Sequence, residues 1–166
     1  MANLTFPKAL QQNKRPFWPL SYSLLKNILD DQITDRFVVE LVWERLGYVP
    51  VDISSGIWKP SSFTPQDWSL AFPEAPELIS QRKASIQLTR SIPSPYKQLL
   101  KEKLKFNGYQ IGELYPRRTR RATAVNWLIA WTVSLGKELA DVGPIPALLP
   151  VPENPLEGHP GDPSIA

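Results

Sequence analysis

Residues 116–139 read PRRTRRATAVNWLIAWTVSLGKEL, and this stretch decides the fold. From Ala122 to Gly136 it carries no charged residue. A helix that is apolar over most of its circumference must be buried on most sides, so we predict a central helix over about residues 116–140. The uncharged run is shorter than the roughly 20 residues that cross a bilayer. Its apolar residues recur at helical spacing on two neighbouring faces: Val125, Leu128, Ile129, Leu135 and Leu139 on one, and Ala124, Trp127 and Trp131 on the other.

Four arginines stand at the start of this helix: Arg117, Arg118, Arg120 and Arg121. A helix N-terminus carries partial positive charge, so cations there are disfavoured unless an anion compensates them. Two interpretations stay open. The arginines form internal ion pairs or a solvated face, or they bind an anionic group or an acidic partner.

The composition is that of a single folded domain of 166 residues, with 42% hydrophobic residues, six tryptophans and eighteen prolines. There is no cysteine, which excludes a disulfide framework, a thiolate nucleophile and a cysteine metal site. The first residues lack an apolar stretch of signal-peptide length. We therefore expect a cytoplasmic protein without a membrane span.

The positive charge is concentrated in one block. The net charge is only +3, but residues 82–121 hold eleven Lys or Arg and two Asp or Glu, whereas residues 122–166 hold one and five. A local positive field of this kind can steer anionic partners.

The expected fold class is α+β: a mostly helical single domain built on the central helix, with a small sheet of two or three short strands. We expect an extended N-terminal arm over residues 1–17, docked by Phe17 and Trp18, and the globular domain over 18–141. Residues 142–166 are rich in proline and glycine, and this composition predicts a disordered tail.

Local signals place the other elements. Ser21 or Ser23 can cap a helix that reaches about Leu29, and Thr34 or Asp35 can cap a second helix that stops at Gly47. A third helix is expected over about 94–106. Short strands are expected at 48–53, at 84–89, where Ala84, Ile86 and Leu88 alternate with polar residues, and at 109–114.

The motifs of common enzymes are missing. The only histidine, His159, lies in the proline-rich tail, so a Ser-His-Asp triad and a standard zinc site are excluded. There is no phosphate-binding glycine loop. We therefore expect no cofactor and no metal. Glu40 and Glu44 lie one helical turn apart and could hold a hard cation or act as acid–base residues, but exposed helices commonly carry this spacing. A carboxylate-dependent enzyme is the third candidate function.

The basic block favours an interaction module without catalytic activity. Its binding residues would be Arg117, Arg118, Arg120 and Arg121, supported by Lys97, Lys101 and Lys105, which recur every fourth residue. The expected partner is an acidic protein or a phosphate-bearing ligand. The alternative is nucleic-acid binding through the phosphate backbone, without sequence preference. Base readout is less favoured because the 94–106 helix has no Asn or Arg and a single Gln, Gln98, among the residue types that usually read bases.

Three segments of the sequence resemble a known family: residues 35–48 (DRFVVELVWERLGY), residues 88–93 (LTRSIP) and residues 111–122 (IGELYPRRTRRA). They resemble an uncharacterised family of small soluble proteins from cyanobacteria and the plastids of photosynthetic eukaryotes. The resemblance covers roughly residues 18–140. It implies a cyanobacterial cytoplasmic setting and a housekeeping or assembly role near the photosynthetic machinery, but it supplies no activity, cofactor or site residue.

Overall fold

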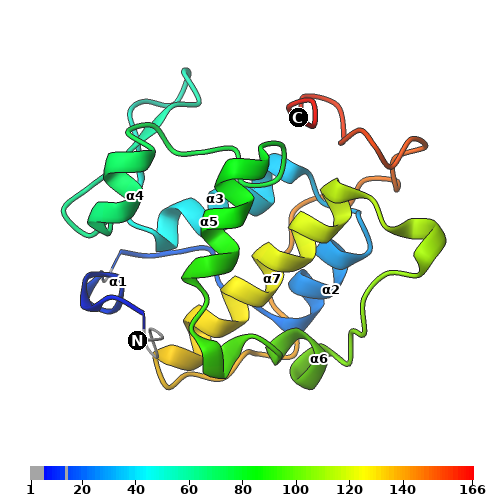
Figure 1. Cartoon of the computed structure of the whole chain (residues 1–166), viewed down its shortest axis with the longest axis horizontal. Helices are drawn as coiled ribbons and strands as arrows, with labels where there is room; N and C mark the ends of the chain where they lie inside the picture. Colours follow the sequence, from blue (N-terminus) through cyan, green and yellow to red (C-terminus); the bar gives the residue numbers. More distant parts are fainter. Residues whose placement is uncertain (1–5, 14) are drawn as a thin grey trace.

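The structure is a computed structural model that describes residues 6–13 and 15–166. Within these residues there are seven α-helices, and the longest, α7 (Pro116–Ser134), is central and contacts α2, α3, α5 and α6 (Figure 1). The other helices are α1 (Lys8–Gln12), α2 (Tyr22–Leu29), α3 (Asp35–Arg45), α4 (Gln66–Ala71), α5 (Arg82–Ser91) and α6 (Leu99–Leu104).

Helix α7 confirms the predicted central helix. Every residue from Ala124 to Thr132 is buried, and Pro116 occupies the first turn. The helix ends at Ser134 rather than near 140, because Gly136 adopts a positive φ of 71° that breaks the helical path.

Helices α2 and α3 begin at the residues that the sequence indicates. The Ser21 hydroxyl accepts a hydrogen bond from the Leu24 N–H at 3.1 Å, and the Thr34 hydroxyl accepts one from the Phe37 N–H at 3.0 Å. Gly47 follows α3 with φ of 90°, and a Cβ there would lie 2.8 Å from the Thr64 nitrogen. Only glycine fits this turn without strain.

A small antiparallel sheet completes the α+β fold. Strand β1 (Val49–Pro50) pairs with β2 (Trp58–Lys59), with Val49 opposite Lys59. The strand predicted at 48–53 is therefore confirmed in its first half.

Two predicted strands are wrong. Residues 84–89 belong to helix α5, whose buried residues Ala84, Ser85 and Leu88 form a helical stripe. The alternation that indicated a strand fails at Ile86, which is 36% exposed. Residues 111–113 form a single 3-10 turn (Ile111–Glu113), not a strand. The helix predicted over 94–106 is split into a 3-10 turn (Ser94–Tyr96) and α6.

The arm is partly helical. Leu10 of α1 is buried, and Phe17 and Trp18 make edge-to-face contacts with Trp131 and Phe37 at ring-centroid distances of 5.7 and 5.1 Å. These contacts confirm the predicted docking. Residues 1–5 and 14 of the predicted arm lie outside the described residues.

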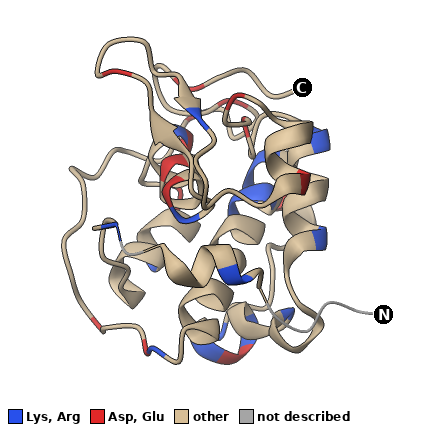
Figure 2. Cartoon of the chain, turned by 90° about the vertical axis from the view of Figure 1, so that its left-hand side faces the viewer, with Lys and Arg blue, Asp and Glu red and all other residues tan. Residues whose placement is uncertain are grey.

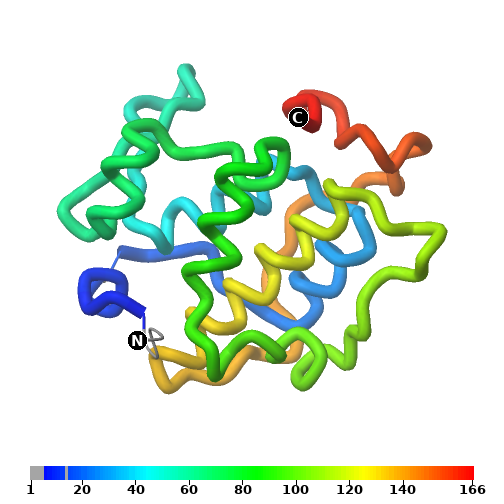
Figure 3. The backbone as a smooth tube through the Cα atoms, viewed as in Figure 1, coloured from blue at the N-terminus to red at the C-terminus, as the bar shows by residue number. Residues whose placement is uncertain are grey.

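The structure corrects the prediction of a disordered C-terminal tail. After α7 the chain runs back along the body (Figure 3), and its backbone is hydrogen-bonded to α2 and to the loop before α3. The Tyr22 N–H donates to the Ala140 carbonyl at 2.9 Å, and the Leu149 N–H donates to the Gln32 carbonyl at 2.9 Å. Specific main-chain pairs of this kind do not show in amino-acid composition. Over the described residues, no helix has the length and apolarity that a bilayer span requires.

Candidate functional site

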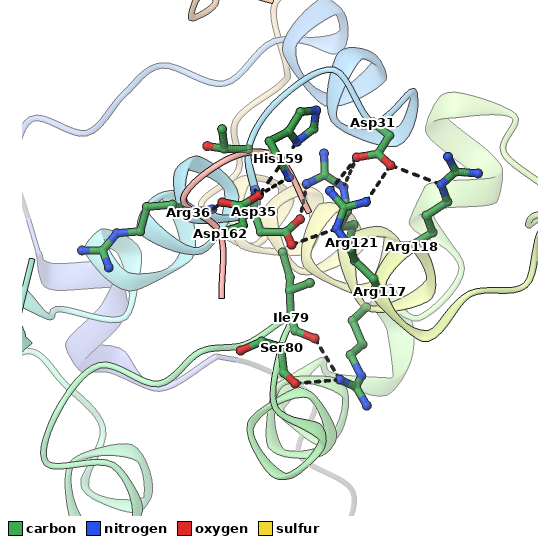
Figure 4. Close-up of polar contacts among 12 residues, drawn as sticks. Asp31, Asp35, Arg36, Ile79, Ser80, Arg117, Arg118, Arg121, His159 and Asp162 are labelled. Atoms are coloured by element: carbon green, nitrogen blue, oxygen red, sulfur yellow. Dashed lines mark hydrogen bonds and ion pairs between the residues drawn. The ribbon is translucent and has the colours of Figure 1, made fainter. Parts of the chain in front are cut away.

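The first turns of α7 carry the arginines into an internal cluster with two aspartates (Figure 4). Arg117 binds Asp31 with both terminal nitrogens, at 2.6 and 2.7 Å, and its Nε donates to Asp35 at 2.9 Å. Arg118 reaches the same Asp31 carboxylate from the surface side at 3.2 Å. The fork geometry of the Arg117–Asp31 pair is the strongest form of this interaction.

Arg121 lies one turn further into the core. Its Nη1 donates to Asp35 at 2.6 Å, and its Nη2 donates to the carbonyls of Ile28 and Ile33 at 2.9 and 2.7 Å. The side chain therefore also satisfies the C-terminal end of α2, where helix carbonyls lack partners.

The electrostatics of the cluster follow from this geometry. Burial on its own raises the pKa of Asp31, but the hydrogen bonds and charges of Arg117 and Arg121 outweigh it and hold the pKa below its usual value. Burial likewise opposes the charge of Arg117, and Asp31 and Asp35 overcome it, so its pKa is raised. The two aspartates supply the negative charge that a basic helix N-terminus requires.

Arg117 and Arg121 are only 1% and 0% exposed. They are therefore not available to an external partner. Both form internal ion pairs, which is one of the two interpretations that the sequence left open. The prediction that these two residues bind a partner is corrected on this point. Their Asp partners, 82 and 86 residues away in the chain, were not identified from the sequence.

The C-terminal segment adds a third carboxylate beside the cluster. Asp162 accepts hydrogen bonds from the backbone N–H groups of Asp35 and Arg36 at 2.9 and 3.2 Å, so it caps helix α3. It also accepts the N–H of His159 at 2.9 Å. The His159 ring is buried against it, with Nδ1 3.8 Å from the carboxylate. Neither residue was given a role from the sequence, because both lie in the segment that composition marked as disordered.

The remaining predicted residues lie apart from this cluster. Arg120 points to the other side of α7, where its Nη1 donates to the carbonyls of Ile79 and Ser80 at 2.9 and 3.2 Å. Lys97, Lys101 and Lys105 are exposed along α6 and its flanks. Figure 2 shows basic positions, in blue, spaced along several helices.

Arg120 lines a surface depression that we call the basic groove. It lies between α5 and the start of α7 and has a volume of about 580 Å³. The lining residues that the structure describes include three arginines and no carboxylate: Arg82, Ser85, Ile86, Thr89, Arg90, Leu114, Pro116, Thr119 and Arg120. Burial and then the nearby Arg82 charge lower the pKa of Arg120, whose terminal nitrogens also donate to the Ala166 carbonyl at 3.4 and 3.5 Å. Arg82 and Arg90 were not singled out from the sequence, although they belong to the same basic block.

Glu40 and Glu44 do not form a joint site. Glu40 pairs with Arg36 at 3.2 Å, and Glu44 pairs with Arg45 at 2.8 Å and accepts the Trp18 N–H at 3.0 Å. Burial raises the pKa of Glu44 against the opposing charge of Arg45. Among the described residues no group of three or more His, Cys, Asp or Glu could hold a metal ion.

Comparisons with known proteins identify a family. A family model described as "Domain of unknown function (DUF1823)" matches residues 19–133, a range that contains both the arginine cluster and the whole basic groove. A chain whose structure was solved in solution by NMR superposes with a TM-score of 0.60 and is 47% identical, over 72% of this chain and 98% of that chain. The comparison with curated proteins gave no match.

Proposed function

Since the chain belongs to the family of the domain of unknown function DUF1823, we propose its role from its own surface: an interaction module, without catalytic activity, whose basic groove binds an acidic protein. The binding residues are Arg82, Arg90 and Arg120, with Lys97, Lys101 and Lys105 of the adjoining α6 region extending the positive surface. The proposal includes a cytoplasmic location, which the lack of cysteine favours.

The observation that carries the proposal is the unbalanced charge of the groove. Three guanidinium groups line it without an acidic neighbour in the lining. None of the ion pairs among the described residues involves Arg82, Arg90 or Arg120. Arginine forks match carboxylates with two parallel hydrogen bonds, so acidic side chains are suitable ligands.

Apolar side chains between the arginines favour a protein over a nucleic acid. Ile86 is 36% exposed and Leu114 is 56% exposed, and both line the groove. Apolar contacts surrounded by arginine are typical of protein interfaces. The described lining holds no aromatic ring on which a base could stack, which a single-strand platform would need.

The test is affinity capture from an extract of the organism that makes the protein, with and without nuclease. The wild-type chain is compared with the double variant Arg82→Glu/Arg90→Glu, which leaves Arg120 and its backbone contacts intact. The control is Lys26→Glu/Lys137→Glu, which changes the net charge equally at two exposed positions outside the groove. Circular dichroism checks that each variant is folded.

A protein retained by the wild type and the control, but lost from the groove variant, supports the proposal. Recovery that disappears with nuclease, and that falls steeply with salt, would instead favour the phosphate backbone of a nucleic acid. Equal recovery by all three baits contradicts a binding role for the groove.

A further inference from the structure

A second hollow, with different chemistry, lies where α5, α6 and α7 meet. Its volume is about 370 Å³, within the range of small-molecule sites. The most buried residues that line it are Ile92, Ala122 and Asn126, with the half-buried Leu100 and Phe106 beside them. The exposed lining residues include Lys97 and Lys101. An apolar floor therefore opens toward a basic mouth.

The walls of this cavity are fixed by hydrogen bonds. The Asn126 amide joins α7 to both parts of the α6 region: its Oδ1 accepts the Leu100 N–H at 2.8 Å, and its Nδ2 donates to the Tyr96 carbonyl at 3.1 Å. Outside the lining, beside Ile92, the Trp127 ring nitrogen donates to the Ser91 hydroxyl at 3.0 Å and joins α7 to the end of α5. A cavity with walls fixed in this way binds a ligand without ordering them first.

The polar groups around the floor are already committed. Asn126 uses both ends of its amide, and the hydroxyls of Thr89 and Thr123 donate to helix carbonyls at 2.9 and 3.2 Å. The other polar lining residues, Gln98, Asn107 and Thr119, are exposed to solvent. An aliphatic or aromatic body over the floor therefore leaves no buried polar group without a partner.

The charge at the mouth has one sign. The described residues that line the cavity include two lysines and no carboxylate. Neither Lys97 nor Lys101 takes part in the ion pairs found among the described residues. A ligand whose body fills the floor would therefore present its anionic end to these two ammonium groups.

We infer that the α5–α6–α7 cavity binds a small amphipathic carboxylate, with its apolar body over Ile92, Phe106 and Ala122 and its carboxylate at Lys97 and Lys101. This site goes beyond the proposed function. Its lining shares Thr89 and Thr119 with the basic groove, and its Lys97 and Lys101 also belong to the positive surface beside the groove, but it does not use the groove arginines.

The experiment titrates the full chain with decanoate by calorimetry and maps the site by NMR shifts of residues 119–123. Decanol and decylamine serve as neutral and cationic probes with the same aliphatic chain. The variant Lys97→Glu/Lys101→Glu removes the basic mouth. The control Lys26→Glu/Lys103→Glu makes the same charge change at exposed positions outside the cavity lining. Ala122→Leu fills the floor, and Thr123→Phe fills it from a half-buried position if the first variant does not fold.

The expected result is saturable decanoate binding, with the largest shifts at residues 119–123. The mouth variant and the filled variant each weaken it at least about tenfold, while the control does not. Decylamine should bind more weakly than decanoate. The groove variant Arg82→Glu/Arg90→Glu should keep decanoate binding even if it loses its protein partner, so the two proposals can fail separately.

The inference is overturned if decanoate fails to bind more tightly than about 1 mM. It is also overturned if the shifts map away from the cavity, if a folded filled variant binds unchanged, or if decylamine binds as tightly as decanoate. Equal weakening by the control and the mouth variant would assign the effect to net charge and would equally exclude recognition by Lys97 and Lys101.

Discussion

Arg121 and Asp35 form an ion pair at 2.6 Å although neither is open to solvent: the arginine is 0% exposed and the aspartate 3%. A charge so deeply buried is tolerated only when it is paired and hydrogen-bonded. The two terminal nitrogens of Arg121 donate to one carboxylate and two main-chain carbonyls, and its Nε lies 3.7 Å from Asp31 without a hydrogen bond. The pair joins the start of α3 to the second turn of α7.

Replacing Arg121 with methionine should destabilise the fold by about 3–5 kcal/mol, because Asp35 and two carbonyls then lose their partner inside the core. Urea unfolding followed by tryptophan fluorescence measures the change. Lys26→Met, at an exposed position, is the matched control and should change stability by less than about 0.5 kcal/mol. Equal costs for the two variants would show that the buried cluster does not hold the fold.

The ionised carboxylate of Asp31 should make the folding stability depend on pH in the acid range. Its pKa is lowered in the folded state, so its carboxylate contributes full stability above the unfolded value of about 4. That contribution is lost as the pH falls through the lower folded pKa, because the unfolded chain binds the proton first. Unfolding free energies measured from neutral pH downward should therefore fall more steeply in the wild type than in Asp31→Asn. Parallel curves would contradict the assignment.

Asp162 should stabilise helix α3 as a cap supplied from the far end of the chain. Asp162→Ala removes the acceptor for the N–H groups of Asp35 and Arg36 and should cost about 0.5–2 kcal/mol. Glu157→Ala, an exposed acid of the same segment, is the control. Hydrogen exchange at the two amides reports the effect locally, and unchanged protection of both amides would exclude the cap.

Alanine variants of two glycines can distinguish the cost of backbone strain from the cost of steric overlap. Gly47 and Gly108 both have positive φ, of 90° and 100°, but only Gly47 has atoms close to where a Cβ would stand. Gly108→Ala should cost about 1–2 kcal/mol from conformation alone. Gly47→Ala should cost more, since its Cβ would lie 2.8 Å from the Thr64 nitrogen. Thermal unfolding of the two variants measures the difference, and equal costs would contradict the close approach.

Local signals in the sequence predicted the parts of the fold that local physics sets. The apolar run after Arg121 predicted the central helix, and Ser21 and Thr34 predicted where α2 and α3 begin. The α5 helix was missed because Ala84 and Leu88, one helical turn apart, also fit an alternating pattern. Packing against α7 favours the helix over the strand, and α7 lies too far away in the sequence for a local pattern to include it.

The candidate site was predictable only in outline. The basic block contains the arginines of both the buried cluster and the basic groove, but charge counting could not distinguish Arg117, which turns inward to Asp31, from Arg120, which turns to the groove. Neighbouring positions on a helix face different directions, so the tertiary partner on each side decides the role. The cap from Asp162 depends on the path of the C-terminal segment, which amino-acid composition does not determine.

The ion pairs between α7 and the α2–α3 region also set the order in which the protein can be completed during synthesis. Asp35 and Arg121 are 86 residues apart. At about 5–20 residues per second, a ribosome needs roughly 4–17 s to add them. Throughout that interval the nascent α2 and α3 carry two aspartates that cannot be buried without their arginines. The first half of the chain should therefore stay open until the last helix emerges, which makes α7 the step that commits the nascent chain to its fold.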